Sequence, residues 1–195
     1  CRQSKVKHLV YGSSSSVYGM NVKQPFSIGD RVDHPISLYA ATKKSNELMA
    51  YSYSHLYGIP STGLRFFSVY GPYGRPDMAY YKFTKAILNE ETIDIYNNGE
   101  MYRDFTYIDD VVDAIYKCCI KTPSSNKNFD NYYPQPSTSF APYRIFNVGS
   151  NNPINLLDFI QTLESALGIK ARKIMKEMQP GDVEATFADI NMLYK

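Results

Sequence analysis

The 195-residue sequence contains no tryptophan, only three cysteines and no long apolar run. Cys118 and Cys119 are adjacent and Cys1 is the first residue, so the cysteines have neither the spacing of a disulfide framework nor that of a zinc site. We therefore expect reduced thiols, a cytoplasmic protein and no bound metal. An apolar run of about 18 residues, which a membrane span needs, is missing, and no signal peptide is visible, so we expect no membrane partner.

The sequence also lacks any block of charge of one sign. Its 21 basic and 19 acidic residues are interspersed and give a net charge of +2. A nucleic-acid-binding protein usually carries a clustered basic stripe, so we expect no nucleic-acid partner. The composition, 44% hydrophobic and 21% charged, is that of a globular protein long enough to bury a core. Tyrosine is abundant, with 18 residues, but tyrosine serves both packing and polar contacts and decides nothing alone.

Stretches of β-branched and apolar residues alternate with stretches of helix-forming residues. The pattern predicts strands at residues 7–11, 61–72, 92–96, 101–108 and 143–150. It predicts helices at residues 37–58, 79–89, 111–121 and 155–168. This alternation is typical of βαβ units and predicts an α/β fold with a mainly parallel sheet.

Local signals predict how several of these elements begin and end. Ser37 is expected to cap the long helix, and Gly58 to terminate it. Asp109 or Asp110 is expected to cap the helix that follows, which is a simpler interpretation than a catalytic pair of carboxylates. Asn98-Gly99 predicts a hairpin turn. Residues 124–142, rich in Ser, Pro, Asn and Tyr, are expected to form an irregular surface segment.

Four consecutive serines, residues 13–16, follow the first predicted strand. Ligands of parallel α/β sheets bind at the carboxyl ends of the strands, which is where this run falls. We therefore expect the hydroxyl groups to face a ligand and not to lie in a slack loop.

Tyr39 and Lys43 are spaced i, i+4 on a predicted helix and so share one face. A lysine ammonium stabilises a neighbouring phenolate, which makes the tyrosine a usable base. The spacing alone does not identify a site, because Tyr81 and Lys85 repeat it. Ser14, at the end of a predicted strand, adds a hydrogen-bond donor. Together Ser, Tyr and Lys suit the interconversion of an alcohol and a ketone.

Several ordered motifs make the sequence similar to a known superfamily. The stretches "SSSSVYG", "SLYAATKK", "LRFFSVYGPYGRPDM" and "YRDFTYIDD" closely resemble the extended short-chain dehydrogenase/reductases, and among them the NAD-dependent epimerase/dehydratase family. Within it the sequence most resembles the UDP-glucuronate 4-epimerases. The resemblance covers essentially the whole chain, and residues 124–142 match least well. It implies the C-terminal part of a Rossmann-type doubly wound parallel sheet plus a smaller substrate-binding α/β domain.

The resemblance also implies a division of the chain into two parts. The remainder of the NAD-binding Rossmann domain would comprise residues 1–76, 92–115 and 143–150. The UDP-sugar-binding part would comprise residues 77–91, 116–142 and 151–195. The Gly-rich turn with which the superfamily binds NAD is missing, because the 11 glycines never form G-x-x-G-x-x-G. We therefore expect a fragment that lacks the first strands and a short C-terminal piece, and that is inactive by itself.

Carried over residue by residue, the family pattern makes Tyr39 the catalytic base and Lys43 the partner that tunes it and binds the nicotinamide ribose of NAD. Ser14 would bind the sugar O4 atom, and Phe66 and Phe67 would lie against the nicotinamide. The remaining substrate contacts would come from Ser15, Ser16, Ser68, Arg75, Tyr96, Arg103 and Asp182. Among these, Tyr96 and Asp182 would hold the uridine and Arg103 the diphosphate.

Two features bear on the substrate. Related dehydratases and decarboxylases carry acidic residues where this sequence has Ser15 and Ser16, and epimerisation at C4 needs no such carboxylate. Arg75 falls where glucuronate epimerases bind the sugar carboxylate, a planar partner for a guanidinium. From sequence context alone, Arg75 is equally an ordinary surface residue of a Gly/Pro loop.

The resemblance thus implies an isomerase that interconverts UDP-glucuronate and UDP-galacturonate through a 4-keto intermediate with bound NAD, for polysaccharide biosynthesis. A homodimer formed through the helix of residues 37–58 is expected by analogy. Two alternatives remain open. The substrate is another UDP-hexose, such as UDP-glucose or a UDP-N-acetylhexosamine, or the chain is a non-catalytic interaction protein of the same fold.

Overall fold

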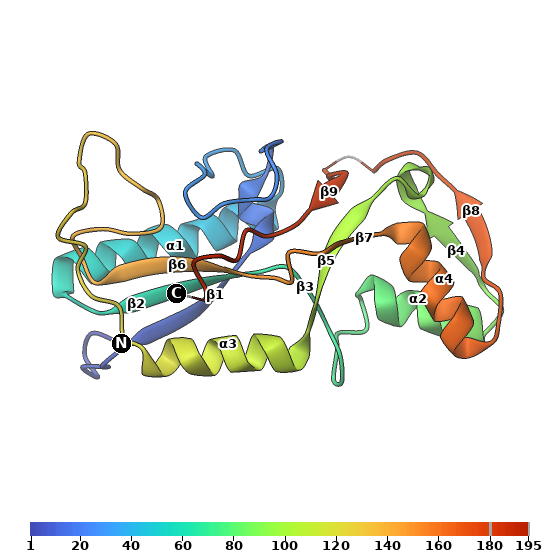
Figure 1. Cartoon of the computed structure of the whole chain (residues 1–195), viewed down its shortest axis with the longest axis horizontal. Coiled ribbons are helices and arrows are strands. Elements are labelled where there is room, and N and C mark those ends of the chain that lie inside the picture. Colours follow the sequence, from blue (N-terminus) through green and yellow to red (C-terminus); the bar gives the residue numbers. More distant parts are fainter. Residues whose placement is uncertain (180, 195) are drawn as a thin grey trace.

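The computed structural model describes residues 1–179 and 181–194 (Figure 1). Its first layer is a parallel sheet in the order β1-β2-β6, formed by β1 (Leu9–Ser14), β2 (Ser61–Phe66) and β6 (Tyr143–Val148). Helix α1 (Leu38–Tyr57) covers one face of this sheet, and α3 (Ile108–Ile120) covers the other (Figure 1). A parallel sheet with helices on both faces is the doubly wound arrangement that the sequence predicts.

The residues of β2 show why this sheet is buried on both sides. Successive side chains of a strand point to opposite faces, and nearly all of β2 is buried. Leu64 packs towards α3 in a cluster formed by Leu64, Val111, Ala114, Cys118 and Val148. The cluster on the other face is formed by Ala50 of α1 with Ala141, Tyr143 and Ile145.

The ends of α1 follow the sequence signals. The Ser37 hydroxyl accepts a hydrogen bond from the Ala40 N–H at 3.1 Å, which satisfies one free donor of the first turn. Gly58 ends the helix with φ of 62°, a left-handed conformation that glycine adopts without steric cost. These two residues therefore fix where the predicted catalytic tyrosine and lysine sit on the helix.

The second part of the structure contains the remaining helices and strands (Figure 1). One sheet has the order β3-β5-β7 with β9 also on β5, from β3 (Ser68–Tyr70), β5 (Tyr102–Tyr107), β7 (Pro153–Asn155) and β9 (Ala185–Thr186). A parallel pair, β4 (Thr92–Ile95) and β8 (Arg172–Met175), packs with α2 (Ala79–Leu88) and α4 (Leu156–Leu167). Its core is formed by Ile93, Ile95 and Ile160.

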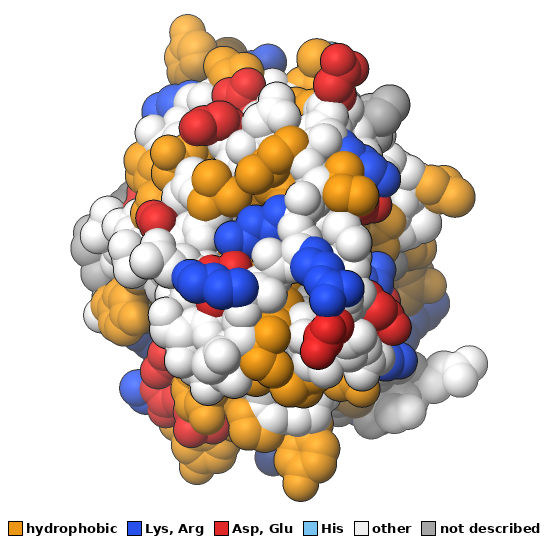
Figure 2. Space-filling model, turned by 90° about the vertical axis from the view of Figure 1, so that its right-hand side faces the viewer, with side chains coloured by type: hydrophobic (Ala, Val, Ile, Leu, Met, Phe, Trp, Pro, Cys, Tyr) orange, Lys and Arg blue, Asp and Glu red, His pale blue; other side chains and the backbone are white. Residues whose placement is uncertain are grey.

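Charges of both signs alternate over the face at the β4–β8 end of the molecule. Figure 2 shows this face with Lys and Arg side chains beside Asp and Glu and with apolar groups between them. Two ion pairs join the segments around β4 and β8: Arg172 with Glu90 at 2.8 Å and Lys176 with Asp94 at 2.7 Å. Basic and acidic side chains are interspersed on the face that Figure 2 shows.

Three predicted features differ in the structure. The strand expected at 61–72 is broken at Phe67, so that β2 and β3 belong to different sheets. The hairpin expected at Asn98-Gly99 is wrong, because β5 is flanked by β3, β7 and β9 while β4 pairs with β8; the turn instead forms the 3₁₀ helix η2 (Tyr96–Gly99). Neither Asp109 nor Asp110 caps α3; both lie in its first turn, where the helix dipole favours carboxylates.

The irregular segment predicted at residues 124–142 is confirmed, since it contains no helix and only an isolated bridge from Thr138 to Arg144. None of the helices in residues 1–179 and 181–194 has the length and apolarity of a membrane span.

Candidate functional site

The carboxyl ends of β1 and β2 open into a cavity of about 750 Å³. Most of the residues that the sequence predicts for the site line it: Ser14, Ser15, Ser16, Tyr39, Lys43, Phe66, Phe67, Ser68 and Arg75. They come from β1, the 3₁₀ helix η1 (Ser15–Tyr18), the start of α1, the end of β2 and the loop after β3. Segments far apart in the sequence thus meet at one edge of the sheet, as expected for a ligand site of this fold.

The serine run forms an ordered turn and not a slack loop. Ser14 caps η1: its hydroxyl oxygen accepts a hydrogen bond from the Ser16 N–H at 3.2 Å, and its O–H donates to the Ser16 hydroxyl at 3.1 Å. The Ser13 hydroxyl donates a hydrogen bond to the buried Glu47 carboxylate at 2.7 Å, so its proton is not available to a ligand. The hydroxyl groups of Ser14, Ser15 and Ser16 line the cavity, but the Ser14 O–H has to turn away from Ser16 before it can donate to a ligand.

Tyr39 and Lys43 lie on the first two turns of α1 and face the serine turn. The Lys43 ammonium lies 5.7 Å from the centroid of the Tyr39 ring and donates to the Gly12 carbonyl at 3.2 Å. This bond ties the lysine to β1, two residues before Ser14. The Tyr39 ring is 52% exposed and so is accessible from the cavity.

The second pair with this spacing lies in a different place. Tyr81 and Lys85 are on α2 and line a separate surface depression with Pro76 and Glu91. The structure therefore separates the two pairs, which the spacing alone does not.

A buried ion pair behind the cavity was missed by the sequence analysis. Arg65 of β2 is fully buried and donates from Nε and Nη2 to the two carboxylate oxygens of Glu47, at 2.8 and 2.9 Å. Glu47 lies one helical turn beyond Lys43, so the pair joins α1 to the sheet beside the site. Burial acts to raise the pKa of Glu47, but hydrogen bonds from Arg65 and Ser13 outweigh it and hold this pKa below its ordinary value.

A signal for this pair is present in the sequence. A single arginine within the otherwise apolar predicted strand "STGLRFF" has to find a buried partner, and a glutamate at the i+4 position from Lys43 offers one. Among the described residues, Nη1 of Arg65 is a buried side-chain nitrogen with no hydrogen-bond partner.

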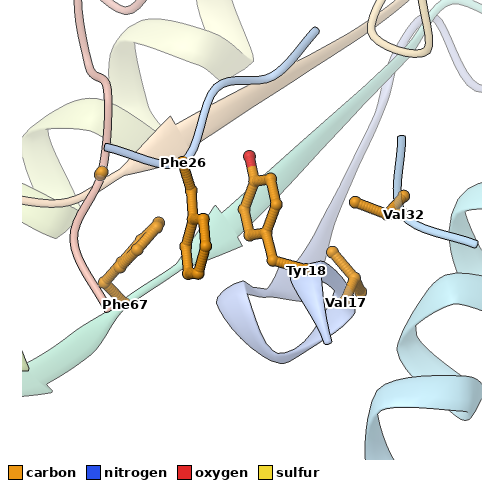
Figure 3. Close-up of a cluster of buried hydrophobic side chains, with 6 residues drawn as sticks. Val17, Tyr18, Phe26, Val32 and Phe67 are labelled. Carbon is orange, nitrogen blue, oxygen red and sulfur yellow. The ribbon is translucent and has the colours of Figure 1, made fainter. Parts of the chain in front are cut away.

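An aromatic cluster packs against η1, the 3₁₀ helix of the serine turn (Figure 3). Tyr18 stacks on Phe26 with ring centroids 4.5 Å apart, and its hydroxyl donates to the Asn147 side-chain oxygen at 2.7 Å. Phe67 lies beside Phe26 in the same cluster and is 8% exposed. Phe67 thus combines a structural role with its place in the cavity wall, whereas Phe66 packs on the α3 side of the sheet.

Arg75 lies on the loop between β3 and α2, at the cavity wall. It forms a two-bond fork with Asp77, from Nε to Oδ1 at 3.0 Å and from Nη2 to Oδ2 at 2.5 Å. Both side chains are largely exposed, at 73% and 53%. The hydrogen bond from Arg75 lowers the pKa of the Asp77 carboxyl.

A smaller cavity of about 240 Å³ adjoins the first and shares Ser15, Ser16 and Ser68 with it. Arg103 and Asp182 line this second cavity. Arg103 donates to the carbonyl oxygens of Tyr102 and Glu184, at 2.9 and 3.1 Å, and burial lowers its pKa.

Tyr96 is the one predicted site residue that lines neither of these two cavities. It lies on η2, where its ring centroid is 5.9 Å from the Lys176 ammonium. Within residues 1–179 and 181–194, no group of three or more His, Cys, Asp or Glu side chains has an arrangement that could hold a metal ion.

The chain is similar to several known proteins over nearly its whole length. The sequence is 55% identical over 194 residues to Protein CapI of Staphylococcus aureus, covering 100% of this chain and 58% of that protein. It is 50% identical over 191 residues to a probable UDP-glucuronate 4-epimerase of Rhizobium meliloti (strain 1021), covering 96% of this chain and 55% of that protein. The chain thus spans little more than half the length of these curated relatives.

Among solved structures, the fold is similar to that of UDP-glucuronic acid 4-epimerase from Bacillus cereus in complex with UDP-glucuronic acid and NAD. The TM-score is 0.79 at 31% identity, covering 99% of this chain and 56% of that one. This likeness confirms the Rossmann-type α/β fold. Residues 1–133 match the NAD dependent epimerase/dehydratase family. The chain belongs to that family.

Proposed function

We propose that the protein containing this chain is a 4-epimerase that interconverts UDP-glucuronate and UDP-galacturonate. The observation that carries the proposal is one cavity in which Ser14, Tyr39 and Lys43 meet, with Arg75 in its wall. The relatives named above support the same reaction. The NAD-binding and substrate-binding division of the chain, and the roles of the individual site residues, are part of this proposal.

In the proposed reaction Tyr39, as phenolate, takes the proton of the sugar O4 hydroxyl. Lys43, whose ammonium lies 5.7 Å from the centroid of the Tyr39 ring, is the proposed partner of this base. Ser14 would donate a hydrogen bond to the oxygen on which charge develops, once its O–H turns away from Ser16. The proton returns from Tyr39 when the alcohol is formed again. Because the alcohol is oxidised and reduced within one cycle, no external reductant is consumed.

The cavity wall fits the nicotinamide end of NAD, because it combines the polar Tyr39 and Lys43 with the apolar rings of Phe66 and Phe67. When bound, NAD supplies a reversible hydride acceptor. The residues that would hold its pyrophosphate are not apparent, since the sequence lacks the Gly-rich turn. The 195 residues alone are therefore predicted to be inactive.

Two further features support a UDP-sugar as substrate. Ser15 and Ser16 are neutral, as epimerisation permits, and line the cavity and its extension. Arg103 and Asp182 line the extension, where they would contact the diphosphate and the uridine. Tyr96 is also predicted to contact the uridine, but it lines neither cavity. For this contact the ligand would have to extend beyond the two cavities, or η2 would have to move.

A homodimer through α1 is supported by the exposed apolar residues of that helix, including Leu48, Met49 and Leu56.

The test uses the complete protein that contains this chain, incubated with UDP-glucuronate without added cofactor, and follows UDP-galacturonate by NMR. Tyr39→Phe should lower turnover at least about 100-fold, the scale of a lost general base. Tyr81→Phe, in the second pair on α2, is the matched control and should leave turnover unchanged. No product from a sample with bound NAD would exclude the glucuronate assignment. No product and no bound NAD would favour the non-catalytic alternative.

One observation favours a second candidate, the epimerisation of a neutral UDP-hexose. The charge of Arg75 is already compensated by Asp77, so that Arg75 does not present an unpaired charge to the cavity. Ser14, Tyr39 and Lys43 act only on the C4 alcohol and do not require a sugar carboxylate. Faster turnover of UDP-glucose or UDP-N-acetylglucosamine than of UDP-glucuronate would select this candidate.

A further inference from the structure

The Arg75–Asp77 pair lies on a loop with a well-defined backbone. Tyr73 has φ of 62°, in the left-handed region that bulky residues rarely adopt. A Cβ at Gly74 would lie 2.4 Å from the Tyr80 hydroxyl, so that any larger residue there would require the Tyr80 side chain to shift. The Gly74 N–H donates to the Gly71 carbonyl at 3.1 Å. This loop, residues 71–77, therefore holds Arg75 at a fixed place in the cavity wall.

The sequence between the two charged residues restricts their geometry further. Pro76 fixes its own φ and disfavours the helical conformation for the residue before it, Arg75. The Met78 N–H donates to the Arg75 carbonyl at 3.2 Å, and α2 starts directly afterwards. An aspartate before a helix commonly caps it, but the α2 N-terminus has no side-chain cap, and the Asp77 carboxylate binds Arg75 instead.

The fork occupies only one edge of the guanidinium. An arginine has five N–H donors, and Asp77 engages Nε and Nη2. Within the described part of the chain, Nη1 of Arg75 makes no hydrogen bond. The edge formed by Nη1 and the second Nη2 hydrogen is thus left for another planar anion, in the two-bond geometry that a carboxylate prefers.

Stability does not account for this pair. Both partners are largely exposed, and exposed ion pairs contribute little to folding. The pair instead lies at the cavity wall, where the orientation of the Arg75 guanidinium decides which of its N–H groups a ligand can reach. Arg75 lines the same cavity as the proposed base, Tyr39.

We propose that Asp77 is a positioning residue for the sugar carboxylate: it holds one edge of the Arg75 guanidinium so that the other edge is presented to the cavity. This inference rests on the proposed function, in which Arg75 binds a uronate. An unpaired arginine loses considerable rotamer freedom on binding, and Asp77 removes that cost in advance. Repulsion between Asp77 and the sugar carboxylate is reduced, because the Asp77 side chain is largely exposed to water.

The test compares the dissociation constants of UDP-glucuronate and UDP-glucose, measured by calorimetry on the complete protein. Their ratio measures the preference for the anionic sugar. Arg75→Ala should reduce the ratio about 10- to 100-fold, the range for a lost hydrogen-bonded charge. Asp77→Asn should reduce it about 3- to 10-fold, through weaker binding of UDP-glucuronate alone. In the Arg75→Ala background, Asp77→Asn should have no further effect.

Asp113→Asn is the matched control, because Asp113 pairs with Lys117 on α3 at similar exposure and lies outside the cavity. It should leave the ratio unchanged. In turnover, Asp77→Asn should raise KM for UDP-glucuronate with little change in kcat, a split that a merely structural role would not produce.

Two different results would overturn the inference. If Arg75→Ala lowers the ratio and Asp77→Asn leaves it unchanged or raises it, Asp77 is a bystander or a competitor, while the proposed substrate stands. If the protein shows no preference for UDP-glucuronate, or Arg75→Ala does not alter it, the proposed substrate and this inference fail together.

Discussion

Glu47 lies one helical turn beyond the proposed catalytic lysine and receives hydrogen bonds from Ser13 and Arg65 inside the protein. Glu47→Gln would remove the charge that compensates the buried Arg65 guanidinium. We expect the free energy of unfolding of the complete protein to fall by about 3 to 5 kcal/mol, measured by urea denaturation. Asp113→Asn, in an exposed pair, should change it by less than about 1 kcal/mol.

The double variant with Met at positions 47 and 65 is the informative companion. It removes both charges together, so that neither is left uncompensated, and should be less destabilised than Glu47→Gln alone. A loss below about 1 kcal/mol in Glu47→Gln would show that water or another group compensates Arg65.

The serine run shows what can be predicted for single residues. The sequence places the hydroxyl groups at the carboxyl end of a strand, and the structure confirms this place. The sequence alone does not reveal that the Ser13 side chain faces α1 while the Ser14 side chain faces the cavity side of the turn. Side chains alternate along a strand, but which face meets Glu47 depends on how α1 packs, and that contact joins residues distant in sequence.

At the scale of secondary-structure elements, Glu164 connects the end of α4 to β8. Its carboxylate accepts hydrogen bonds from the Lys170 ammonium at 2.9 Å and the Ala171 N–H at 3.0 Å, and pairs with Lys173 at 2.8 Å. Chiefly through Lys173, and then Lys170 and Ala171, the pKa of Glu164 falls from 4.5 to about 2. The carboxylate form is therefore the one that the fold stabilises.

The sign of the pH dependence follows from this lowered pKa. The contribution of Glu164 to stability is complete above its ordinary pKa of 4.5 and is lost as the pH falls towards 2. Glu164→Gln should cost about 1 to 3 kcal/mol at pH 7 and progressively less between pH 4.5 and pH 2, measured by urea denaturation at each pH. A cost that is the same at pH 7 and pH 2 would contradict a role for the charge.

The elements were predictable where the signals are local. Ser37 and Gly58 mark the ends of α1, and both are confirmed. The hairpin at Asn98-Gly99 was wrong for a non-local reason: the partner of β4 is β8, with Thr92 opposite Arg172. No nearby residue indicates this pairing, and a strand whose neighbour comes from the far end of the chain cannot be assigned from turn signals alone.

At the scale of the whole molecule, a fully buried carboxylate holds three distant segments together. Asp104 of β5 accepts hydrogen bonds from the Ser150 N–H and hydroxyl, both at 2.7 Å, and from the N–H groups of Asn151 and Ala188, both at 3.0 Å. A side chain at Gly149 would approach Asp104 to 2.8 Å, so this close packing requires glycine. The residues after β6 and the C-terminal segment are thus fixed on β5.

Asp104→Asn replaces one acceptor atom with a donor and leaves buried N–H groups without a partner. We expect a loss of about 2 to 4 kcal/mol in the free energy of unfolding, and faster hydrogen exchange at the Asn151 and Ala188 amides. Asp109→Asn, in the first turn of α3, should leave both unchanged. Unaltered exchange at Asn151 and Ala188 would show that other contacts hold these segments.

The alternation of strands and helices was sufficient to predict the α/β class and the edge of the sheet where the cavity lies. It was not sufficient for the second part of the structure, whose sheets combine short strands from both halves of the chain. Arg103 and Asp182 meet at one cavity only through that arrangement. Residues of this kind become recognisable from family motifs. Asp104 lies within the motif "YRDFTYIDD", but its structural role emerges only from the contacts.

Two contacts that fix α1 to the sheet limit how a sugar could move in the cavity. Lys43 is bound to the Gly12 carbonyl and Glu47 to Arg65, so successive turns of the helix are fixed to neighbouring strands. A 4-keto sugar has to expose first one face and then the other to the same reactants, and this rotation needs space. The wall with Ser14 and Tyr39 cannot readily yield this space, and the loop of residues 71–77 holds Arg75 in place as well. The rotation would therefore have to take place within the cavity volume of about 750 Å³, with the reacting groups held still.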